Sequence, residues 1–314
     1  MTIAAGLSYL CPSTAQSCSI CACGDPLLAA SDPAAITGTL RLQLDAEYLR
    51  IDAGSEAQPG AIDGLTQWSY RANIVYRPVS RLALMLVAPL LDKSIHTEGT
   101  TAGHAHASQV GIGDVEVAGR YAVWRRIDFA NQRVHELAVS GGTMIPTGST
   151  DARMTDEMGA SVLVDPHGQL GTGGWGPFAG LHYRFEQSDW LAFVDASYRF
   201  RTTGSYADNS KYKFGDAVLW SLHGQYRLHP TVALDLGVDG RYARLDKATD
   251  ADGNVTEKVE DTGGTVLSAA PGIYVNPGSS VWLFVRAQIP FYKDFYGEQD
   301  VKPSVSTGLQ YQAL

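Results

Sequence analysis

Three cysteines within six residues are the side chains of this sequence with the clearest capacity for chemistry. Cys18, Cys21 and Cys23 lie in the segment Cys-Ser-Ile-Cys-Ala-Cys-Gly-Asp-Pro, and thiolates at this spacing suit Cu(I), Zn or an iron-sulfur cluster. Cys11, a side chain from the rest of the protein or a periplasmic partner would supply the fourth ligand. One disulfide plus a free thiol in an oxidising compartment fits the same residues. Two hypotheses therefore stand for this segment, a metal or iron-sulfur site and a disulfide.

Three histidines form a second candidate metal site. His96, His104 and His106 lie in one polar stretch, and imidazoles two residues apart on an extended chain project to the same side. Polar loops also contain histidines without a ligand role, and we favour that interpretation here. The segment Asp250-Ala-Asp-Gly-Asn254 resembles a calcium loop but lacks the glycine at its sixth position, so we interpret it as a turn.

No catalytic constellation accompanies these residues. The sequence has no Gly-x-Ser-x-Gly, no His-Glu-x-x-His and no phosphate-binding glycine loop. The formal net charge of -9 and the lack of a basic stripe argue against a nucleic-acid partner. We therefore expect a protein that is not an enzyme and does not bind nucleic acid.

The N-terminal part of the chain differs from the remainder. Residues 1–17 contain an apolar run and end in Ala15-Gln-Ser, which is typical of a signal-peptide cleavage site, although a basic start is missing and the peptide would be truncated. Cleavage there would leave Cys18 first, where lipidation is a further alternative. Residues 18–35 then form the cysteine segment and a linker rich in alanine and proline. We expect the folded body to span residues 36–314.

Strict alternation of apolar and polar residues dominates that body. From Asp216 to Asp239, Trp220, Leu222 and Leu236 share one face, while polar residues share the other. Strands of about ten residues with one apolar face are typical of a transmembrane β-barrel, whose outside meets lipid. No run of about 18 apolar residues is present, which excludes a helical membrane protein.

The same pattern recurs twelve times, which predicts an all-β, 12-stranded antiparallel transmembrane barrel with a short cysteine-containing N-terminal extension. The expected strands lie at about 37–51, 66–76, 82–90, 112–124, 137–145, 177–186, 190–201, 218–228, 232–238, 265–275, 281–290 and 304–313. The connections alternate between short and long, as periplasmic turns and external loops do. The long ones are 52–65, 91–110, 146–176, 201–214, 245–263 and 291–303. We expect the longest, 146–176, to fold over or into the external mouth.

Charged residues crowd the face of the strands that would point inward. They can pair and fill the lumen, or line a constricted water path, and their balance argues against a strongly anion-selective pore. The candidate lumen residues are Arg41, Asp45, Glu47, Arg71, Asp114, Glu116, Arg120, Arg184, Asp195, Arg199, Asp235, Asp239, Arg241 and Arg286.

Several motifs in the body resemble a known family. They are Gly141-Gly-Thr-Met-Ile-Pro-Thr-Gly148, Gln169-Leu-Gly-Thr-Gly-Gly-Trp-Gly-Pro-Phe-Ala-Gly-Leu-His-Tyr183, Phe214-Gly-Asp, Thr262-Gly-Gly and Pro271-Gly. The chain from about 36 to 314 is similar to the outer-membrane barrels named after the meta-pathway of phenol degradation. The resemblance implies a channel for small, aromatic or apolar solutes. The cysteine segment and the final Leu314, where an aromatic residue is usual, depart from the family pattern.

These observations together predict a channel or transporter in the bacterial outer membrane, in contact with lipid and a small solute. The alternative is a barrel that presents a cysteine-bound metal or iron-sulfur site at its periplasmic end, for metal handling or electron transfer with a periplasmic partner. A closed structural barrel also stays open.

Overall fold

The computed structural model describes most of the chain downstream of residue 39. The described ranges are 40–53, 62–99, 103–155, 161–249, 252–256, 258–259, 262–278, 280–297 and 299–313. The cysteine segment, the proposed signal peptide and the linker lie outside the described residues. No helix in the described ranges is long and apolar enough to cross a membrane.

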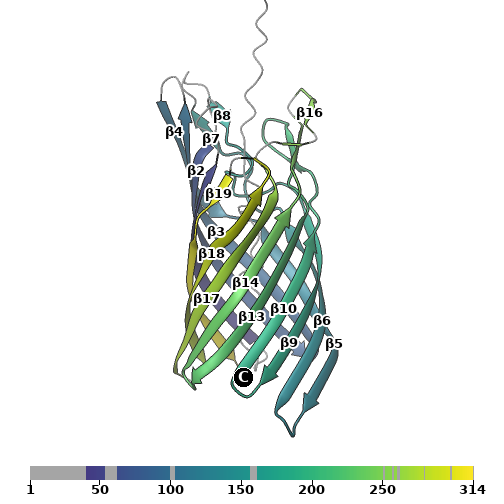
Figure 1. Cartoon of the computed structure of the whole chain (residues 1–314). Coiled ribbons are helices and arrows are strands. Elements are labelled where there is room, and N and C mark those ends of the chain that lie inside the picture. The colour runs from purple at the N-terminus through teal and green to yellow at the C-terminus, as the bar shows by residue number, and fades with distance from the viewer. Residues whose placement is uncertain are drawn as a thin grey trace, which may run out of the picture.

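Twelve antiparallel strands form a closed barrel (Figure 1). Their order around the ring follows the chain, and β1 pairs with β20 from Leu40 opposite Ala313 to Tyr48 opposite Val305, which closes the ring. The strands are β1 (Leu40–Ala53), β2 (Ile62–Val79), β3 (Leu82–Gly99), β5 (Val115–Asp128), β6 (Arg133–Ile145), β9 (Gly176–Gln187), β10 (Trp190–Arg199), β13 (Ala217–His229), β14 (Val232–Ala243), β17 (Gly264–Gly278), β18 (Val281–Phe295) and β20 (Ser304–Ala313). The predicted fold is confirmed.

The two ends of the barrel differ in the length of their connections. Turns at 80–81, 129–132, 188–189, 230–231 and 279–280 are short, and they lie at the end that carries the C-terminus (Figure 1). The connections at the opposite end are all longer. Short turns face the periplasm in outer-membrane barrels, so the end with the C-terminus is named the periplasmic end below and the other the external end.

The segment 91–110 is not the loop that the sequence predicted. β3 runs on to Gly99 and pairs with β4 (Gly103–Ile112), so the two form a hairpin that extends beyond the ring (Figure 1). The prediction ended the strand at Leu90 because Asp92 and Lys93 interrupt the apolar pattern. Lys93 is buried inside the barrel and Asp92 lies opposite Val110 in the hairpin, so neither charge ends the strand.

Short strands occupy four of the other external connections. β7 (Arg153–Thr155) pairs with β8 (Ser161–Leu163), and β19 (Gln299–Val301) pairs with β1. A separate four-stranded sheet contains β11 (Gly204–Ser205), β12 (Lys211–Lys213), β15 (Lys247–Thr249) and β16 (Val255–Thr256).

Large apolar side chains cover the outside of the barrel, as the alternation predicted. Leu44 is 54% exposed and Leu236 is 68% exposed, and so regular an apolar exterior fits lipid rather than water. Aromatic pairs such as Trp190 with Tyr226, 4.6 Å between ring centroids, lie near strand ends. The predicted outward residues found exposed include Leu42, Leu44, Trp68, Tyr70, Ile74, Tyr76, Leu84, Leu86, Leu90, Tyr121, Val123, Leu137, Val139, Leu181, Tyr183, Val194, Phe200, Leu222, Tyr226, Leu228, Leu234 and Leu236.

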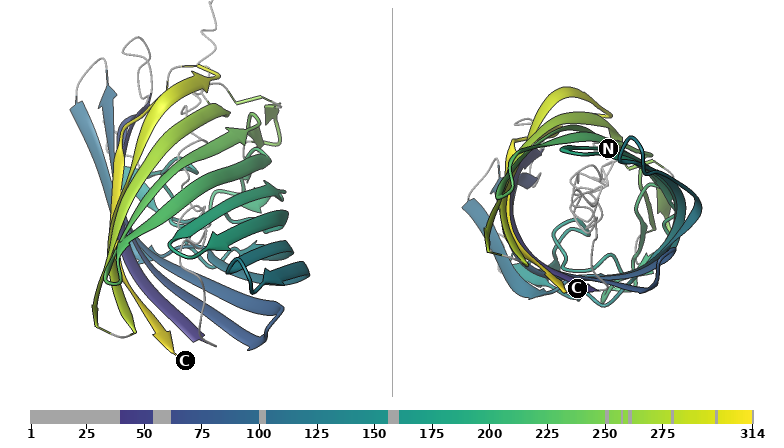
Figure 2. Two further views of the ribbon diagram at one scale, coloured as in Figure 1. Left: turned by 60° about the horizontal axis from the view of Figure 1, so that its bottom comes forward. Right: turned by 90° about the horizontal axis from the view of Figure 1, so that it is seen from below.

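Part of the 146–176 connection folds into the external mouth. Val164 is buried in one apolar cluster with Ile51 and Ile95 from one side of the barrel wall and Ala217 and Val266 from another. Seen along the barrel axis, teal segments of the chain lie inside the ring of strands (Figure 2). The lumen is therefore narrowed at its external end by the chain itself.

Candidate functional site

The charged residues predicted to face the lumen all lie away from the exposed outer surface. Ten are buried, namely Arg41, Asp45, Arg71, Asp114, Glu116, Arg199, Asp235, Asp239, Arg241 and Arg286. Four others have side chains that are between 13% and 22% exposed to solvent, namely Glu47, Arg120, Arg184 and Asp195. The structure brings most of these residues into a few local groups rather than one continuous ring.

The first group joins β1 to β2. Asp45 and Arg71 are direct partners in the strand register, and the Arg71 guanidinium lies 2.7 Å from Asp45 and 2.6 Å from Glu47. Gln43 and Asn73 donate further hydrogen bonds to Asp45, at 3.1 and 2.8 Å. The buried carboxylate is thus well satisfied, which is the condition for burying a charge.

The second group centres on a histidine that sequence reasoning did not single out. The ring of His223 lies between two carboxylates, with Nδ1 3.0 Å from Asp235 and Nε2 3.0 Å from Asp239. Arg286 donates to Asp239 at 2.6 Å. Gly237 lies opposite His223 in the register, and a Cβ there would run into the imidazole ring. The glycine therefore makes room for the ring.

The third group crosses strands that are not neighbours. Arg199 on β10 donates to Glu116 on β5 at 2.8 Å, although β6 and β9 lie between these strands in the ring. The guanidinium carbon lies 4.9 Å from the centroid of the Phe178 ring on β9. The curvature of the closed barrel brings these side chains together.

A fourth group is less completely paired. His182 Nδ1 lies 2.6 Å from Asp195, whereas Arg120 is 3.8 Å from the same carboxylate. Arg184 binds Glu186 two residues along its own strand. The Nε atoms of Arg120 and Arg184 are buried and have no hydrogen-bond partner among the described residues.

Asp114 has a different role from the other candidate lumen residues. Its carboxylate accepts hydrogen bonds from the Gly148 amide at 3.0 Å, and from the amide and hydroxyl of Thr172 at 2.8 and 2.7 Å. Gly148 and Gly171 touch backbone to backbone, with no space for a Cβ on either. Asp114 thereby joins the two motifs, Pro-Thr-Gly and Leu-Gly-Thr-Gly, that carry the family resemblance.

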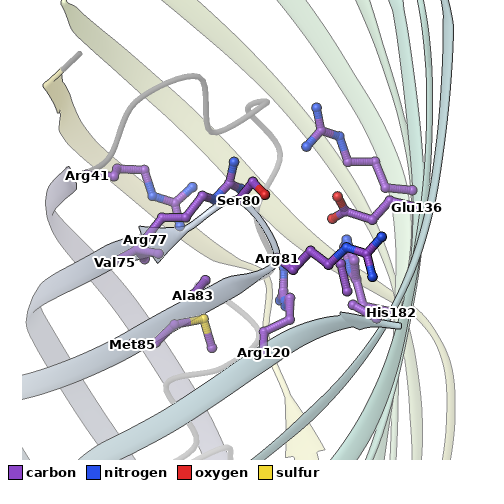
Figure 3. Close-up of a pocket in the computed structure, with 13 residues that line it drawn as sticks. Arg41, Val75, Arg77, Ser80, Arg81, Ala83, Met85, Arg120, Glu136 and His182 are labelled. Carbon is purple, nitrogen blue, oxygen red and sulfur yellow. The ribbon is translucent and has the colours of Figure 1, made fainter. Parts of the chain in front are cut away.

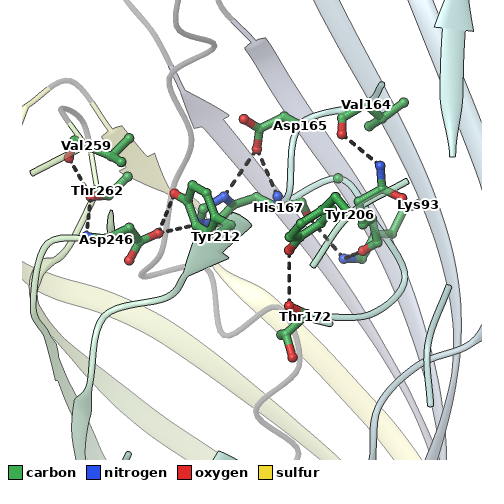
Figure 4. Close-up of polar contacts among 12 residues, drawn as sticks. Lys93, Val164, Asp165, His167, Thr172, Tyr206, Tyr212, Asp246, Val259 and Thr262 are labelled. Atoms are coloured by element: carbon green, nitrogen blue, oxygen red, sulfur yellow. Dashed lines mark hydrogen bonds and ion pairs between the residues drawn. The ribbon is translucent and has the colours of Figure 1, made fainter. Parts of the chain in front are cut away.

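A polar cluster holds the inserted segment to the wall (Figure 4). His167 lies with Nδ1 3.2 Å from Asp165 and Nε2 3.1 Å from Asp246. Burial by itself would lower the pKa of His167, but the two carboxylates outweigh it and raise the pKa to about 10. Lys93 on β3 donates to the backbone carbonyls of His167 and Gln169, at 3.1 and 2.6 Å.

Sequence reasoning missed the residues of this anchor. Lys93, His167 and Asp246 were not selected, because the segments that contain them were interpreted as loops. Asp246 is fully buried and accepts hydrogen bonds from the Tyr212 hydroxyl at 2.7 Å and the Gly215 amide at 2.6 Å. The available signal was weak, since a single polar residue in a loop does not reveal its burial.

A cavity inside the barrel combines apolar and charged lining. Met85, Phe178 and Leu219 provide apolar surface, and Arg120 and Asp195 provide charge. Met85, Phe178 and Leu219 are each less than 9% exposed.

The candidate metal ligands remain outside what the structure describes. Cys18, Cys21 and Cys23 fall before the first described residue. His96 lies on β3 opposite His106 on β4, and Glu98 lies opposite His104, but the side chains of these residues are not described. No group of three metal-ligating side chains occurs within the part of the chain that is described.

No protein-family model matches the sequence. No curated protein matches it either. Solved structures of outer-membrane proteins share its architecture, and three of them are described here. An outer membrane channel from Pseudomonas putida F1 is 14% identical, with a TM-score of 0.64, and the match covers 89% of this chain and 98% of that one. The transport unit of the autotransporter AIDA-I from Escherichia coli is 9% identical, with a TM-score of 0.52 and coverage of 93% and 98%. The translocator domain of the autotransporter NalP from Neisseria meningitidis is 13% identical, with a TM-score of 0.51 and coverage of 92% and 93%.

These likenesses define a class of protein. The chain has the fold of a bacterial outer-membrane β-barrel, and it spans nearly the full length of each of these structures. At such low identities the comparison concerns the fold alone. The comparisons therefore confirm the outer-membrane barrel fold that the motifs predicted. They do not show that the chain belongs to the family that the motifs resemble.

Proposed function

We propose that this protein is a passive channel of the bacterial outer membrane for small solutes with an apolar or aromatic body. One observation carries the proposal, namely the cavity that Met85, Phe178 and Leu219 line inside a barrel whose inner wall also carries many charged residues. Apolar side chains with a few polar groups are the usual lining of a small-molecule site.

The remaining features support transport rather than catalysis. The similar structures with the higher TM-scores are a channel and two autotransporter barrels. The family that the motifs resemble implies aromatic or apolar solutes. The segment around Val164 narrows the external mouth, so the passage we propose is small and suited to single molecules.

Uptake of the apolar dye N-phenylnaphthylamine tests this proposal. The lipopolysaccharide leaflet of a host cell slows the dye, which fluoresces once it reaches the inner lipid. Cells that express the barrel should show a faster rise in fluorescence than cells with an empty vector. Leu219→Gln keeps the size of the side chain but makes the cavity polar, so its dye entry should be slower.

Leu236→Gln is the matched control, because it makes the same change on the outer face. Heat-dependent mobility in detergent gels reports whether each variant has assembled. Dye entry at the empty-vector rate, in cells with normally assembled wild-type barrel, would reject the proposed function.

A further inference from the structure

The outermost part of the β3–β4 hairpin concentrates residue types that bind metal ions. Three of the chain's eight histidines and one glutamate lie within residues 96–106, namely His96, Glu98, His104 and His106. The sequence predicted a loop here, in which histidines have no fixed position relative to one another. The structure instead pairs β3 with β4 through this whole region, so the four residues have a defined register.

Two adjacent cross-strand pairs contain all four residues. His96 lies opposite His106, and Glu98 lies opposite His104. Residues two apart on one strand share a face with the residues opposite them. The four positions therefore form the corners of one patch, called the histidine patch below. The corners are about 5 Å apart across the strands and about 7 Å apart along them.

The other face of the hairpin packs against the barrel's own core. Ile95 is 2% exposed and belongs to the apolar cluster of the external mouth. Ala107, its partner in the register, packs against the same cluster. His96 and His106 are the next residues along from this pair, so the histidine patch lies on the opposite face.

The residues below the patch show where it lies relative to the membrane. Leu90 and Ile112 are opposite each other on the same face of the hairpin, 44% and 61% exposed, and they continue the lipid-facing surface. Ser94 opposite Ser108 comes next, and the patch follows. The hairpin extends beyond the ring at the external end (Figure 1). The patch is thus beyond the apolar band, on the side of the external medium.

The pocket on the inner wall near the periplasmic end has a different chemistry (Figure 3). Its charged lining is mostly arginine, whose guanidinium group stays protonated and has no lone pair for a metal ion. His182 also lines this pocket, and its Nδ1 already lies 2.6 Å from Asp195. A metal ion is therefore expected at the hairpin rather than in this pocket.

We propose that His96, Glu98, His104 and His106 form a binding site for a divalent transition-metal ion, for which Zn²⁺ is the probe. Imidazole nitrogens and carboxylate oxygens are ligands that zinc takes in proteins, four of them in a tetrahedron about 2 Å from the metal. Calcium and magnesium prefer oxygen ligands alone, so three histidines favour zinc. The bound ion would join β3 to β4 at the outer end of the hairpin. The site does not depend on the proposed channel function.

Calorimetric titration of the full chain with Zn²⁺ in a zwitterionic detergent tests the site. The protein is prepared without a polyhistidine tag, and its thiols are alkylated beforehand, so that the N-terminal cysteines do not bind the metal. The wild type should bind one Zn²⁺ per chain. His96→Gln and His106→Gln should each weaken binding at least about tenfold. Glu98→Gln should weaken it less, because an amide oxygen can still coordinate the ion.

A double variant tests the register itself. His106→Ala with Ala105→His keeps three histidines in the hairpin but moves one of them to the other face, so it should bind Zn²⁺ no better than His106→Ala alone. His229→Gln is the matched control, because His229 is an exposed histidine at the opposite end of the barrel. Its affinity for Zn²⁺ should equal that of the wild type. Heat-dependent mobility in detergent gels reports whether each variant has assembled.

Four results would each overturn the proposal. They are a fully assembled wild type that does not bind Zn²⁺ saturably, an unchanged affinity in His96→Gln, a double variant that binds as the wild type does, and equal affinities for Zn²⁺ and Ca²⁺. The last result would indicate attraction of cations by charge alone. Selective Zn²⁺ binding that is lost with the histidines and with their register would establish the site.

Discussion

The two faces of the barrel wall are built from the same strands, but the outer face contacts lipid and the inner face contacts other side chains. On β13, Leu222 is 51% exposed on the outside, and the next residue, His223, is 1% exposed on the inside. An outward side chain that contacts lipid needs only to be apolar, so one apolar residue type can substitute for another at these positions. An inward residue must match particular partners, as His223 does with Asp235 and Asp239. Outward positions should therefore respond to the class of a substitution, and inward positions to the loss of a specific contact.

Loss of the inward-facing Arg71 should have the largest effect on barrel stability. Its guanidinium is the cation for both Asp45 and Glu47 and is only 7% exposed. Arg71→Met leaves two carboxylates near each other inside the barrel, which should lower the free energy of unfolding by about 3 to 5 kcal/mol. Urea unfolding in lipid vesicles, followed by tryptophan fluorescence, measures the change.

The double variant Arg71→Met with Asp45→Asn sharpens the test. It removes one of the two carboxylates that lose their arginine partner, so the double variant should be more stable than Arg71→Met alone. If the double variant is instead less stable by the sum of the two single effects, the inward pair acts no differently from two independent residues.

A charge on the outer face should have the next largest effect. Leu236→Arg places a cation in lipid near the middle of β14, which should cost about 2 to 4 kcal/mol of barrel stability. Gln225→Arg is the matched control, because Gln225 faces inward and lines a cavity at the periplasmic end. The same unfolding experiment applies. Equal costs for the two substitutions would show that the faces are assigned wrongly.

The smallest effect concerns the loop segment that His167 helps to hold. Its pKa is raised to about 10 by Asp165 and Asp246, against an ordinary value of 6.5. A raised pKa stabilises the folded state below the ordinary value, and this contribution is lost as the pH rises through the folded value. Hydrogen exchange in 164–172 should therefore become faster, relative to His167→Gln at the same pH, between about pH 6.5 and pH 10. An unchanged ratio across that range would remove His167 from the anchor.

The outer face could be predicted from the sequence almost residue by residue. Every second residue of a strand contacts lipid, and each of these residues needs only to be apolar. The pairing of Asp45 with Arg71 also follows once the register of β1 and β2 is known. The pairing of Glu116 with Arg199 does not, since β6 and β9 separate their strands and only the curvature of the closed ring brings them together.

Other parts of the candidate site were beyond sequence reasoning for different reasons. Asp114 was predicted to face the lumen, but its hydrogen bonds to Gly148 and Thr172 depend on how a long connection folds back. His182 and His223 lie on the predicted polar face, but the sequence did not select them. The role of a buried histidine depends on which carboxylates lie beside its ring, and the sequence alone does not give those neighbours.

The central claim is that inward-facing charged residues surround a passage through the barrel. Conductance in planar lipid bilayers tests this claim most directly. We expect small, discrete conductance steps for the wild type. Arg120→Gln should shift the ion preference toward cations, measured as the reversal potential across a salt gradient, while Arg126→Gln should leave it unchanged. A fully assembled wild-type barrel that conducts nothing, together with an Arg120→Gln variant that also conducts nothing, would contradict the claim and indicate a closed structural barrel.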